Sequence, residues 1–343
     1  MTKRKPPEPK EEFLERMKSL LDSGEDYEKY LETIKSPAPK SIRVNKIKIS
    51  PENLVKKLKE YKWEIKQPWD DHPEVIIVEG DEKRDRLEPG VLGRTFEHLL
   101  GYYYVQELSS CLPVIALKPF NLYSESETSG ERFLDLCAAP GSKTTQAASE
   151  MKNTGGVVAN DLSIGRIKIL SSNLERCGAT NTIITKKDGI LFGKKLINNG
   201  NKFDKVLVDA PCSGEGTLRS SPRTAIMWNI KTAKNMNKIQ KKLAEVGFEL
   251  LRSGGEMIYS TCTHAPEENE EVVDYLLKKY DGSIEIQKIN LPLKSRPGIK
   301  KWQNKEYDGK VKYSHRIYPQ DNNTDGFFLA KLKKIKENTQ EEL

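Results

Sequence analysis

Two cysteines, Cys212 and Cys262, each follow a short apolar run of the chain. The first run covers residues 206–211 and contains Asp209, and the second covers residues 257–261. β-Branched and aliphatic runs of this length are typical of buried parallel strands. In an open α/β sheet, chemistry collects beyond the carboxyl ends of the strands. If the two strands are neighbours, both thiols and Asp209 face one crevice, which suits covalent chemistry on an electron-poor ring.

A turn of small residues follows an earlier predicted strand, residues 133–136. The turn consists of Cys137, Ala138, Ala139, Pro140, Gly141, Ser142 and Lys143. Small residues let backbone N–H groups approach a ligand at a helix N-terminus. The turn has neither the G-x-G-x-x-G pattern nor the phosphate-binding P-loop pattern. The sequence therefore favours a nucleoside ligand without a pyrophosphate.

Three aspartates, Asp161, Asp188 and Asp209, stand at the ends of predicted strands. An acidic group at the position of Asp161 commonly holds ribose hydroxyls, and a carboxylate at Asp188 is placed to accept from an adenine amino group. The alternative for each aspartate taken alone is a helix cap or a turn former.

Strands and helices alternate from residue 132 onward. Repeated units of this kind predict an α/β fold with a doubly wound, mostly parallel sheet. The segment 326–332 is expected to add a late antiparallel strand. We expect the long helix between the two cysteine strands to cover about residues 232–251 and to end at Gly254 and Gly255.

The first part of the chain is predicted to form a smaller α+β unit. Its apolar residues have helical spacing from Phe13, and a strand–helix–strand pattern follows, with Ser50 as the helix cap. Such a unit with one open sheet face is a common RNA-binding design. The polar segment 118–131 marks a boundary. We expect an N-terminal RNA-binding domain over residues 1–120, similar to an RNA-recognition motif, and a catalytic domain over residues 121–336.

The formal net charge of +7 equals the excess within one stretch, residues 288–316, which holds nine Lys or Arg and two acidic residues. Trp302, Tyr307, Tyr313 and His315 are interleaved with these cations. Cations for phosphates and flat rings for unstacked bases are the combination that single-stranded RNA recognition uses. The alternative is a solvated loop with a few anchoring aromatic residues.

Composition excludes several classes of protein. The five cysteines include no C-x-x-C pair, which argues against a disulfide framework and against a zinc site. No apolar run approaches the roughly 20 residues of a membrane span. The charged, proline-rich start, residues 1–10, is unlike a secretory signal. We therefore expect a cytoplasmic, monomeric protein with no metal and no membrane partner.

Together these motifs resemble the Sun-type RNA (cytosine-C5)-methyltransferases, a family that uses S-adenosylmethionine and has a Rossmann-like sheet. The resemblance runs from about residue 40 through the blocks at 43–45, 106–107, 135–144, 161–178, 209–214, 259–263 and 325–330. Two positions depart from the common pattern of the family: Ser142, where many relatives carry Gly, and Glu215, where many carry a smaller residue.

The resemblance implies a role for each residue. Cys262 is the thiol that adds to C6 of cytosine, Cys212 assists its release, Asp209 contacts the N3/N4 edge, and Lys143 favours the thiolate. From the residues alone, either thiol qualifies as the nucleophile. The implied S-adenosylmethionine site consists of the turn 137–143 together with Asp161, Arg166, Asp188 and Asp209.

RNA is the implied substrate, and transfer RNA is our first expectation because the compact form resembles archaeal-type tRNA members. Ribosomal RNA is the alternative. Two other functions stay open at this point: a methyltransferase for small molecules or protein, and an RNA-binding factor without catalysis. The basic stretch argues against the first, and the presence of both cysteines, Asp209 and Lys143 argues against the second.

Overall fold

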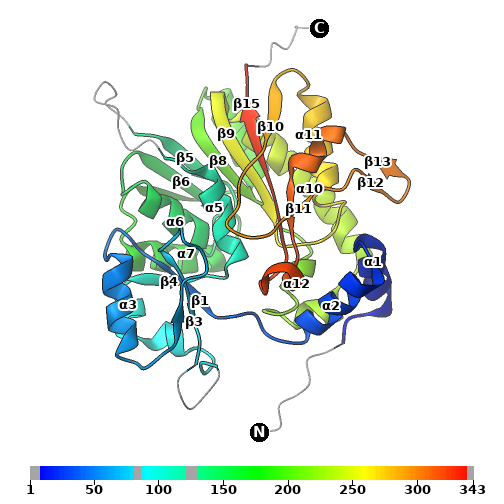
Figure 1. Ribbon diagram of the computed structural model, residues 1–343. Coiled ribbons are helices and arrows are strands. Elements are labelled where there is room, and N and C mark those ends of the chain that lie inside the picture. The colour runs from blue at the N-terminus through cyan, green and yellow to red at the C-terminus, as the bar shows by residue number, and fades with distance from the viewer. Residues whose placement is uncertain (1–7, 81–85, 121–129, 338–343) are drawn as a thin grey trace.

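The computed structural model describes residues 8–80, 86–120 and 130–337, and Figure 1 shows its arrangement. The centre of the expected domain boundary, residues 121–129, lies outside the described residues. So do residues 1–7, which form most of the charged start.

One large sheet forms the centre of the molecule, in the order β11-β14-β15-β9-β8-β5-β6-β7, with β10 paired to β15. Its parallel strands are β5 (Arg132–Asp135), β6 (Gly156–Asp161), β7 (Thr182–Lys186), β8 (Phe203–Asp209) and β9 (Leu251–Thr261). The antiparallel strands are β10 (Ile284–Gln287), β11 (Arg296–Pro297), β14 (His315–Ile317) and β15 (Phe327–Lys334). This confirms the predicted mostly parallel Rossmann-like sheet and its late antiparallel strand.

The strands that precede the two cysteines are neighbours. β8 and β9 pair in parallel, with Asp209 opposite Ser260. Cys212 and Cys262 therefore leave the same edge of the sheet, a few residues beyond this last pair.

Helices cover both faces of the sheet because strand residues alternate between two apolar layers. Leu207 and Ile258 face the layer that contains α5 (Leu112–Leu117) and α6 (Ser142–Glu150). Val208 and Tyr259 face α8 (Gly189–Asn198), α10 (Ile230–Glu249) and α11 (Glu270–Lys279). α7 (Ile164–Cys177) packs through Leu170 beside α6.

The end of the long helix differs from the expectation. α10 ends at Glu249, and Gly254 and Gly255 lie inside β9. Gly254 has a φ of +78°, which bends the start of the strand at a position that favours glycine.

A second sheet, in the order β2-β3-β1-β4, forms the N-terminal α+β part. Its elements are β1 (Ser41–Val44), α3 (Pro51–Lys59), β2 (Ile65–Lys66), β3 (Val75–Val78), η1 (Val91–Arg94), α4 (Phe96–Leu99) and β4 (Tyr103–Val105), with η2 (Ser109–Cys111) after it. The Ser50 side chain caps α3, as predicted. Leu54 and Leu58 of α3 cover one face of this sheet.

The other face of this small sheet, expected to be open, is covered. Arg43 of β1 is buried and donates to the Ser142 carbonyl at 2.7 Å and to Thr145 Oγ1 at 3.0 Å, both in α6. A guanidinium can satisfy several acceptors at once, which explains how a charged residue closes this interface. The face is therefore unavailable for stacking bases in the manner of an RNA-recognition motif.

The first two helices, α1 (Glu11–Leu20) and α2 (Gly24–Ile34), pack against the large sheet's helices instead of the small sheet. Phe13 meets Trp228 edge to face at 5.5 Å, and Arg16 donates to Glu267 at 3.2 Å. Figure 1 shows both helices in dark blue beside α12 (Pro319–Asn322), across the molecule from α3.

The aromatic residues of the basic stretch 288–316 are buried or half-buried, whereas its lysines are exposed. Trp302 and Tyr307 are each only 8% exposed, and Arg316 is buried in an ion pair with Glu270. Three further short elements lie in this stretch: β12 (Lys301–Trp302), β13 (Lys305–Glu306) and η4 (Gly309–Tyr313). Two other short elements, η3 (Glu215–Thr217) and α9 (Arg223–Met227), lie between β8 and α10. The alternative of anchoring aromatic residues fits better than the expected stacking platform.

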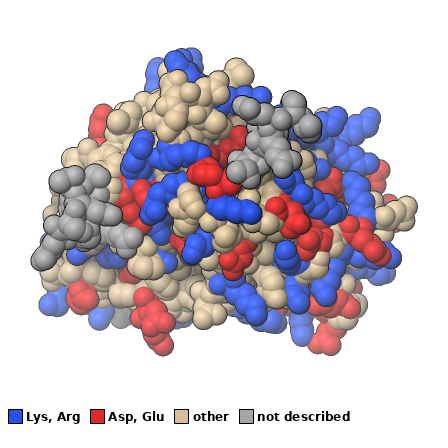
Figure 2. Space-filling model, turned by 90° about the horizontal axis from the view of Figure 1, so that it is seen from above, with Lys and Arg blue, Asp and Glu red and all other residues tan. Residues whose placement is uncertain are grey.

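Surface charges are mixed on the face that Figure 2 presents. Lys and Arg lie interspersed with Asp and Glu across much of it. The positive excess of the chain is therefore not gathered there into a patch of one sign.

Candidate active site

The two thiols meet at the edge of the large sheet. Cys212 Sγ and Cys262 Sγ are 3.2 Å apart. The hydrogen bond with Cys262, together with burial, raises the pKa of Cys212 well above its usual range. Cys262 lines a cavity, and Cys212 is not among the residues that line it. The two cysteines are therefore not equivalent: a ligand in the cavity meets Cys262 first.

Asp209 forms the polar centre of the site. Its Oδ2 accepts from Lys143 Nζ at 2.7 Å and its Oδ1 from Ser260 Oγ at 2.7 Å. Lys143 Nζ also donates to Ser110 Oγ at 3.1 Å. Burial lowers the pKa of Lys143, but the Asp209 carboxylate outweighs it, so this pKa lies above its usual value. Lys143 thus stays charged, and its ion pair fixes both side chains in the cavity wall that also contains Cys262.

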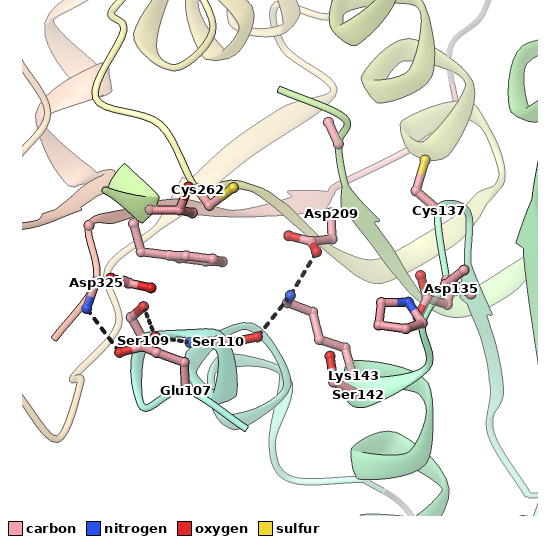
Figure 3. A pocket seen from close by; sticks show the side chains of 17 residues that line it. Glu107, Ser109, Ser110, Asp135, Cys137, Ser142, Lys143, Asp209, Cys262 and Asp325 are labelled. Atoms are coloured by element: carbon pink, nitrogen blue, oxygen red, sulfur yellow. Dashed lines mark hydrogen bonds and ion pairs between the residues drawn. The ribbon is translucent and has the colours of Figure 1, made fainter. Parts of the chain in front are cut away.

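A cavity of about 300 Å³ connects these groups. Figure 3 shows Asp209 between two sides of it, with Asp135 and Cys137 on one side and Cys262 and Asp325 on the other. Its lining consists of Glu107, Ser109, Ser110, Asp135, Cys137, Ala138, Ala139, Pro140, Ser142, Lys143, Asp209, Ala210, Thr217, Cys262, Asp325, Gly326 and Phe327.

The small-residue turn enters α6 through Gly141, which has a φ of +104°. A Cβ at this position would stand 2.9 Å from Leu170 Cδ1, so both backbone angle and space require glycine. The turn brings Ala138, Ala139 and Pro140 to the cavity wall, as expected for a ligand held by a small-residue loop.

Asp161 and Arg166 support this turn from behind. Asp161 Oδ2 accepts from the Ala139 N–H at 3.3 Å and lies 3.3 Å from Arg166 Nη1. Arg166 also donates to the Ala139 carbonyl. Neither residue lines the cavity.

Asp188 also lies away from the cavity wall. Its carboxylate caps α8 and accepts from the N–H groups of Ile190 and Leu191 at 3.0 Å each. This is the helix-cap alternative that the sequence left open for it.

One buried atom tests whether S-adenosylmethionine fits. Asp135 lines the cavity, and its Oδ1 has no hydrogen-bond partner among the described residues. Burial, and then the charge of Asp209, raises the pKa of Asp135 to about 7. An ammonium group on a ligand would supply the missing donor and favour the carboxylate. The turn and this aspartate therefore fit a ligand that carries an amino acid moiety and a nucleoside.

Several polar residues of the site were absent from the predicted set, among them Asp135, Asp325, Ser260, Ser110 and Glu107. Ser260 and Ser110 hold Asp209 and Lys143, and Glu107 lines the cavity. Burial, and then the charge of Asp325, raises the pKa of Glu107 to about 7. Ser260 stands two residues before Cys262 in the strand, and Glu107 belongs to a block that resembled the family, so both signals were present in the sequence.

Within residues 8–80, 86–120 and 130–337, no three or more His, Cys, Asp or Glu residues are grouped to hold a metal ion. No helix in those ranges has the length and apolar character needed to cross a bilayer.

Comparison with known families matches most of the chain. Residues 124–333 match the model for the 16S rRNA methyltransferase RsmB/F, and residues 9–108 match the N-terminal domain of the 16S rRNA methyltransferase RsmF. The chain belongs to the RsmB/F methyltransferase family. This confirms the family that the motifs resembled, and with it the dependence on S-adenosylmethionine.

Relatives within the RsmB/F family have different RNA targets in their names. A tRNA (cytosine(49)-C(5))-methyltransferase of Pyrococcus abyssi is 38% identical over 95% of this chain and 98% of that enzyme. The ribosomal RNA small subunit methyltransferase F of Citrobacter koseri is 38% identical over 94% of this chain and 62% of that enzyme. The chain spans less than two thirds of the length of the bacterial relatives that it matches.

Solved structures agree in fold. A methyltransferase homologue from Pyrococcus horikoshii is 32% identical to this chain and superposes with a TM-score of 0.75. The match covers 95% of this chain and 99% of that one. NSun6 from the same organism, solved with SFG, is 25% identical, with a TM-score of 0.78 over 95% of this chain and 98% of that one.

We expect Gly141→Ala to weaken the binding of S-adenosylmethionine about tenfold, because a side chain in this left-handed conformation costs roughly 1–2 kcal/mol and the turn must shift. Isothermal titration calorimetry measures the change. Gly165→Ala in α7 is the control, since its nearest neighbour for a new Cβ is Ser163 Oγ at 3.9 Å. Equal affinity of both variants and the wild type would show that the turn does not hold the cofactor.

Proposed function

We propose that this protein transfers a methyl group from S-adenosylmethionine to C5 of cytosine in RNA, with tRNA as the substrate. One observation carries the proposal. Two thiols 3.2 Å apart stand beside an ion-paired Asp209, and only Cys262 lines the cavity. An inert pair of buried cysteines needs neither the adjacent ion pair nor the opening to a cavity.

The chemistry follows from the weak nucleophilicity of C5. Cys262 Sγ adds to C6, which gives C5 enamine character and places charge on the N3 edge of the ring. The Lys143 ammonium stabilises this charge through a preorganised contact in a buried site, and the Asp209 carboxylate accepts from the N4 amino group and so orients the ring. When bound, S-adenosylmethionine supplies an electrophilic methyl group to C5.

Release of the product needs two bonds to break. Solvent water takes the proton from C5, the C5–H electron pair restores the C5–C6 double bond, and the C6–S pair returns to Cys262. The raised pKa of Cys212 keeps a proton on that thiol. Its S–H, 3.2 Å from Cys262, donates a hydrogen bond to the departing sulfur. This gives Cys212 the role in release and Cys262 the role of nucleophile.

The cofactor is held by one side of the cavity. The turn 137–143 supplies close backbone contact, Asp135 an acceptor for the ammonium group, and Asp161 an acceptor for ribose hydroxyls, with Arg166 as its support. Asp188 is proposed for the adenine amino group through a carboxylate that also caps α8.

The target cytosine must be unpaired or turned out of its helix, because C6 inside a stack is out of reach of a thiol. We propose tRNA because the archaeal tRNA enzyme is matched over 98% of its length, so each part of that enzyme has a counterpart here. Ribosomal RNA is the second candidate, since the bacterial relatives are equally identical over the shared part.

The two parts of the chain have separate roles in this proposal. The N-terminal part, residues 1–120, contacts RNA through surfaces other than the covered sheet face, and residues 121–336 carry the chemistry. The enzyme acts as a cytoplasmic monomer, without a metal.

The two cysteines give opposite phenotypes in our scheme. Cys212→Ala should accumulate an RNA–protein adduct, because addition proceeds and release slows. Cys262→Ala should form none. A denaturing gel with labelled RNA and S-adenosylmethionine reads out both. Cys177→Ala, a buried cysteine outside the site, is the control and should behave as the wild type. Absence of a shifted band for Cys212→Ala would overturn the roles of the pair.

Lys143→Met should lower kcat about 100-fold, the typical loss when one preorganised electrostatic contact is removed, while the affinity for S-adenosylmethionine changes little. Single-turnover methyl transfer and calorimetry separate the two effects. Lys195→Met, on the exposed side of α8, should leave both unchanged. A loss confined to cofactor affinity would make Lys143 a cofactor ligand only.

Bisulfite sequencing of total RNA from cells with and without the gene identifies the substrate. We expect a 5-methylcytosine signal in tRNA that disappears with the gene. Loss of a signal in 16S rRNA would support the second candidate, and an unchanged pattern in all RNA would refute the proposed function.

A further inference from the structure

Asp325 presents an unused acceptor in the wall of the active-site cavity. The residue is 5% exposed, lines the same cavity as Cys262, and its Oδ1 has no hydrogen-bond partner in the described ranges. Figure 3 shows its side chain extending from the edge of the site toward the cavity interior. A buried carboxylate oxygen without a donor is uncommon, and within a ligand site it indicates a donor on the ligand.

The backbone fixes Asp325 relative to the nucleophile. The Asp325 N–H donates to Glu107 Oε1 at 3.0 Å, and the next residue, Gly326, donates to the Gly216 carbonyl at 2.8 Å. Gly216 in turn donates to the Cys262 carbonyl at 2.9 Å. Two hydrogen bonds therefore link the segment of Asp325 to the segment of Cys262.

A buried cation holds the segment from the other side. Arg219 Nη1 donates to the Thr324 carbonyl at 2.9 Å. Burial raises the pKa of Asp325, and a hydrogen bond from Ser220 and the charge of Arg219 oppose this shift only in part. The unpartnered oxygen of the buried group suits a neutral donor such as a hydroxyl. A phosphate group has no donor to offer and is repelled.

The position of Asp325 indicates that the donor for its free oxygen belongs to the target nucleotide and not to the cofactor. It lies on the same side of Asp209 as Cys262, whereas Asp135 and Cys137 lie on the cofactor side. A cytidine inside an RNA chain has two donor groups, the N4 amino group and the 2′-hydroxyl. Asp209 takes the N4 edge in the proposed function, which leaves the 2′-hydroxyl for Asp325.

We propose that Asp325 Oδ1 accepts a hydrogen bond from the 2′-hydroxyl of the target cytidine, and that this contact makes the site select ribose over deoxyribose. The inference rests on the proposed function and adds a specificity-determining residue to it. The contact orients the sugar so that C6 of the base faces Cys262.

The test compares Asp325→Ala with the wild type on three synthetic RNAs that differ only at the mapped target cytosine, which carries ribose, 2′-deoxyribose or 2′-deoxy-2′-fluororibose. The fluoro sugar keeps the RNA-like pucker but has no donor. For the wild type, both altered sugars should lower kcat/KM about 10- to 100-fold, the range for a hydrogen bond to a charged group. For Asp325→Ala, all three RNAs should react at the same low rate.

The ratio of kcat/KM between the ribose RNA and the altered RNAs distinguishes a loss of sugar recognition from a loss of folded protein. A variant that is merely damaged loses activity on every RNA and keeps the wild-type ratio, and that outcome would overturn the inference. Glu285→Ala, an exposed residue of β10 outside the site, is the control and should keep both the rate and the ratio. If the wild type methylates none of the RNAs, the proposed function fails, and if it methylates ribose and deoxyribose equally, only the role of Asp325 fails.

Discussion

The parallel pairing of β8 with β9 is the constraint on which the site depends. Because Asp209 lies opposite Ser260, the segments that follow β8 and β9 leave the sheet at the same level. The sulfur atoms of Cys212 and Cys262 therefore lie 3.2 Å apart. A shift of one residue in this register would turn Asp209 to the opposite face and separate it from Lys143. The buried aliphatic residues on both faces of the two strands make such a shift costly, so the core of the fold and the geometry of the chemistry are set by the same contacts.

Local pattern was sufficient to predict much of this arrangement. Strand ends that carry Cys212, Cys262 and Asp209, the turn before α6, and the alternation of strands and helices all depend on neighbours close in sequence. Their meeting at one edge follows from the general topology of parallel sheets. The predicted helix cap at Ser50 was confirmed for the same reason, since a cap needs only the next three residues.

What the sequence did not reveal depends on distant partners. The sequence around Arg43 gives no sign of its partners, yet this residue is buried against α6, about 100 residues further along the chain. Trp302 and Tyr307 read as stacking residues, yet Glu267 accepts the indole N–H of Trp302 at 3.2 Å inside the core. Composition cannot distinguish an aromatic ring that faces solvent from one that a remote helix covers. Ser110 was missed as a site residue because its partner, Lys143, comes from a different element, 33 residues further along the chain.

The placement of α1 and α2 has a consequence for biosynthesis. Both helices are translated long before their partners: Arg16 pairs with Glu267, and Asp26 pairs with Arg296. At about 5–20 residues per second, translation of the intervening chain takes roughly 10–50 s. Throughout that interval the apolar faces of both helices, including Phe13 and Tyr30, have no native surface to cover them. A nascent chain with this topology is a natural client for chaperones that bind exposed apolar segments near the ribosome exit.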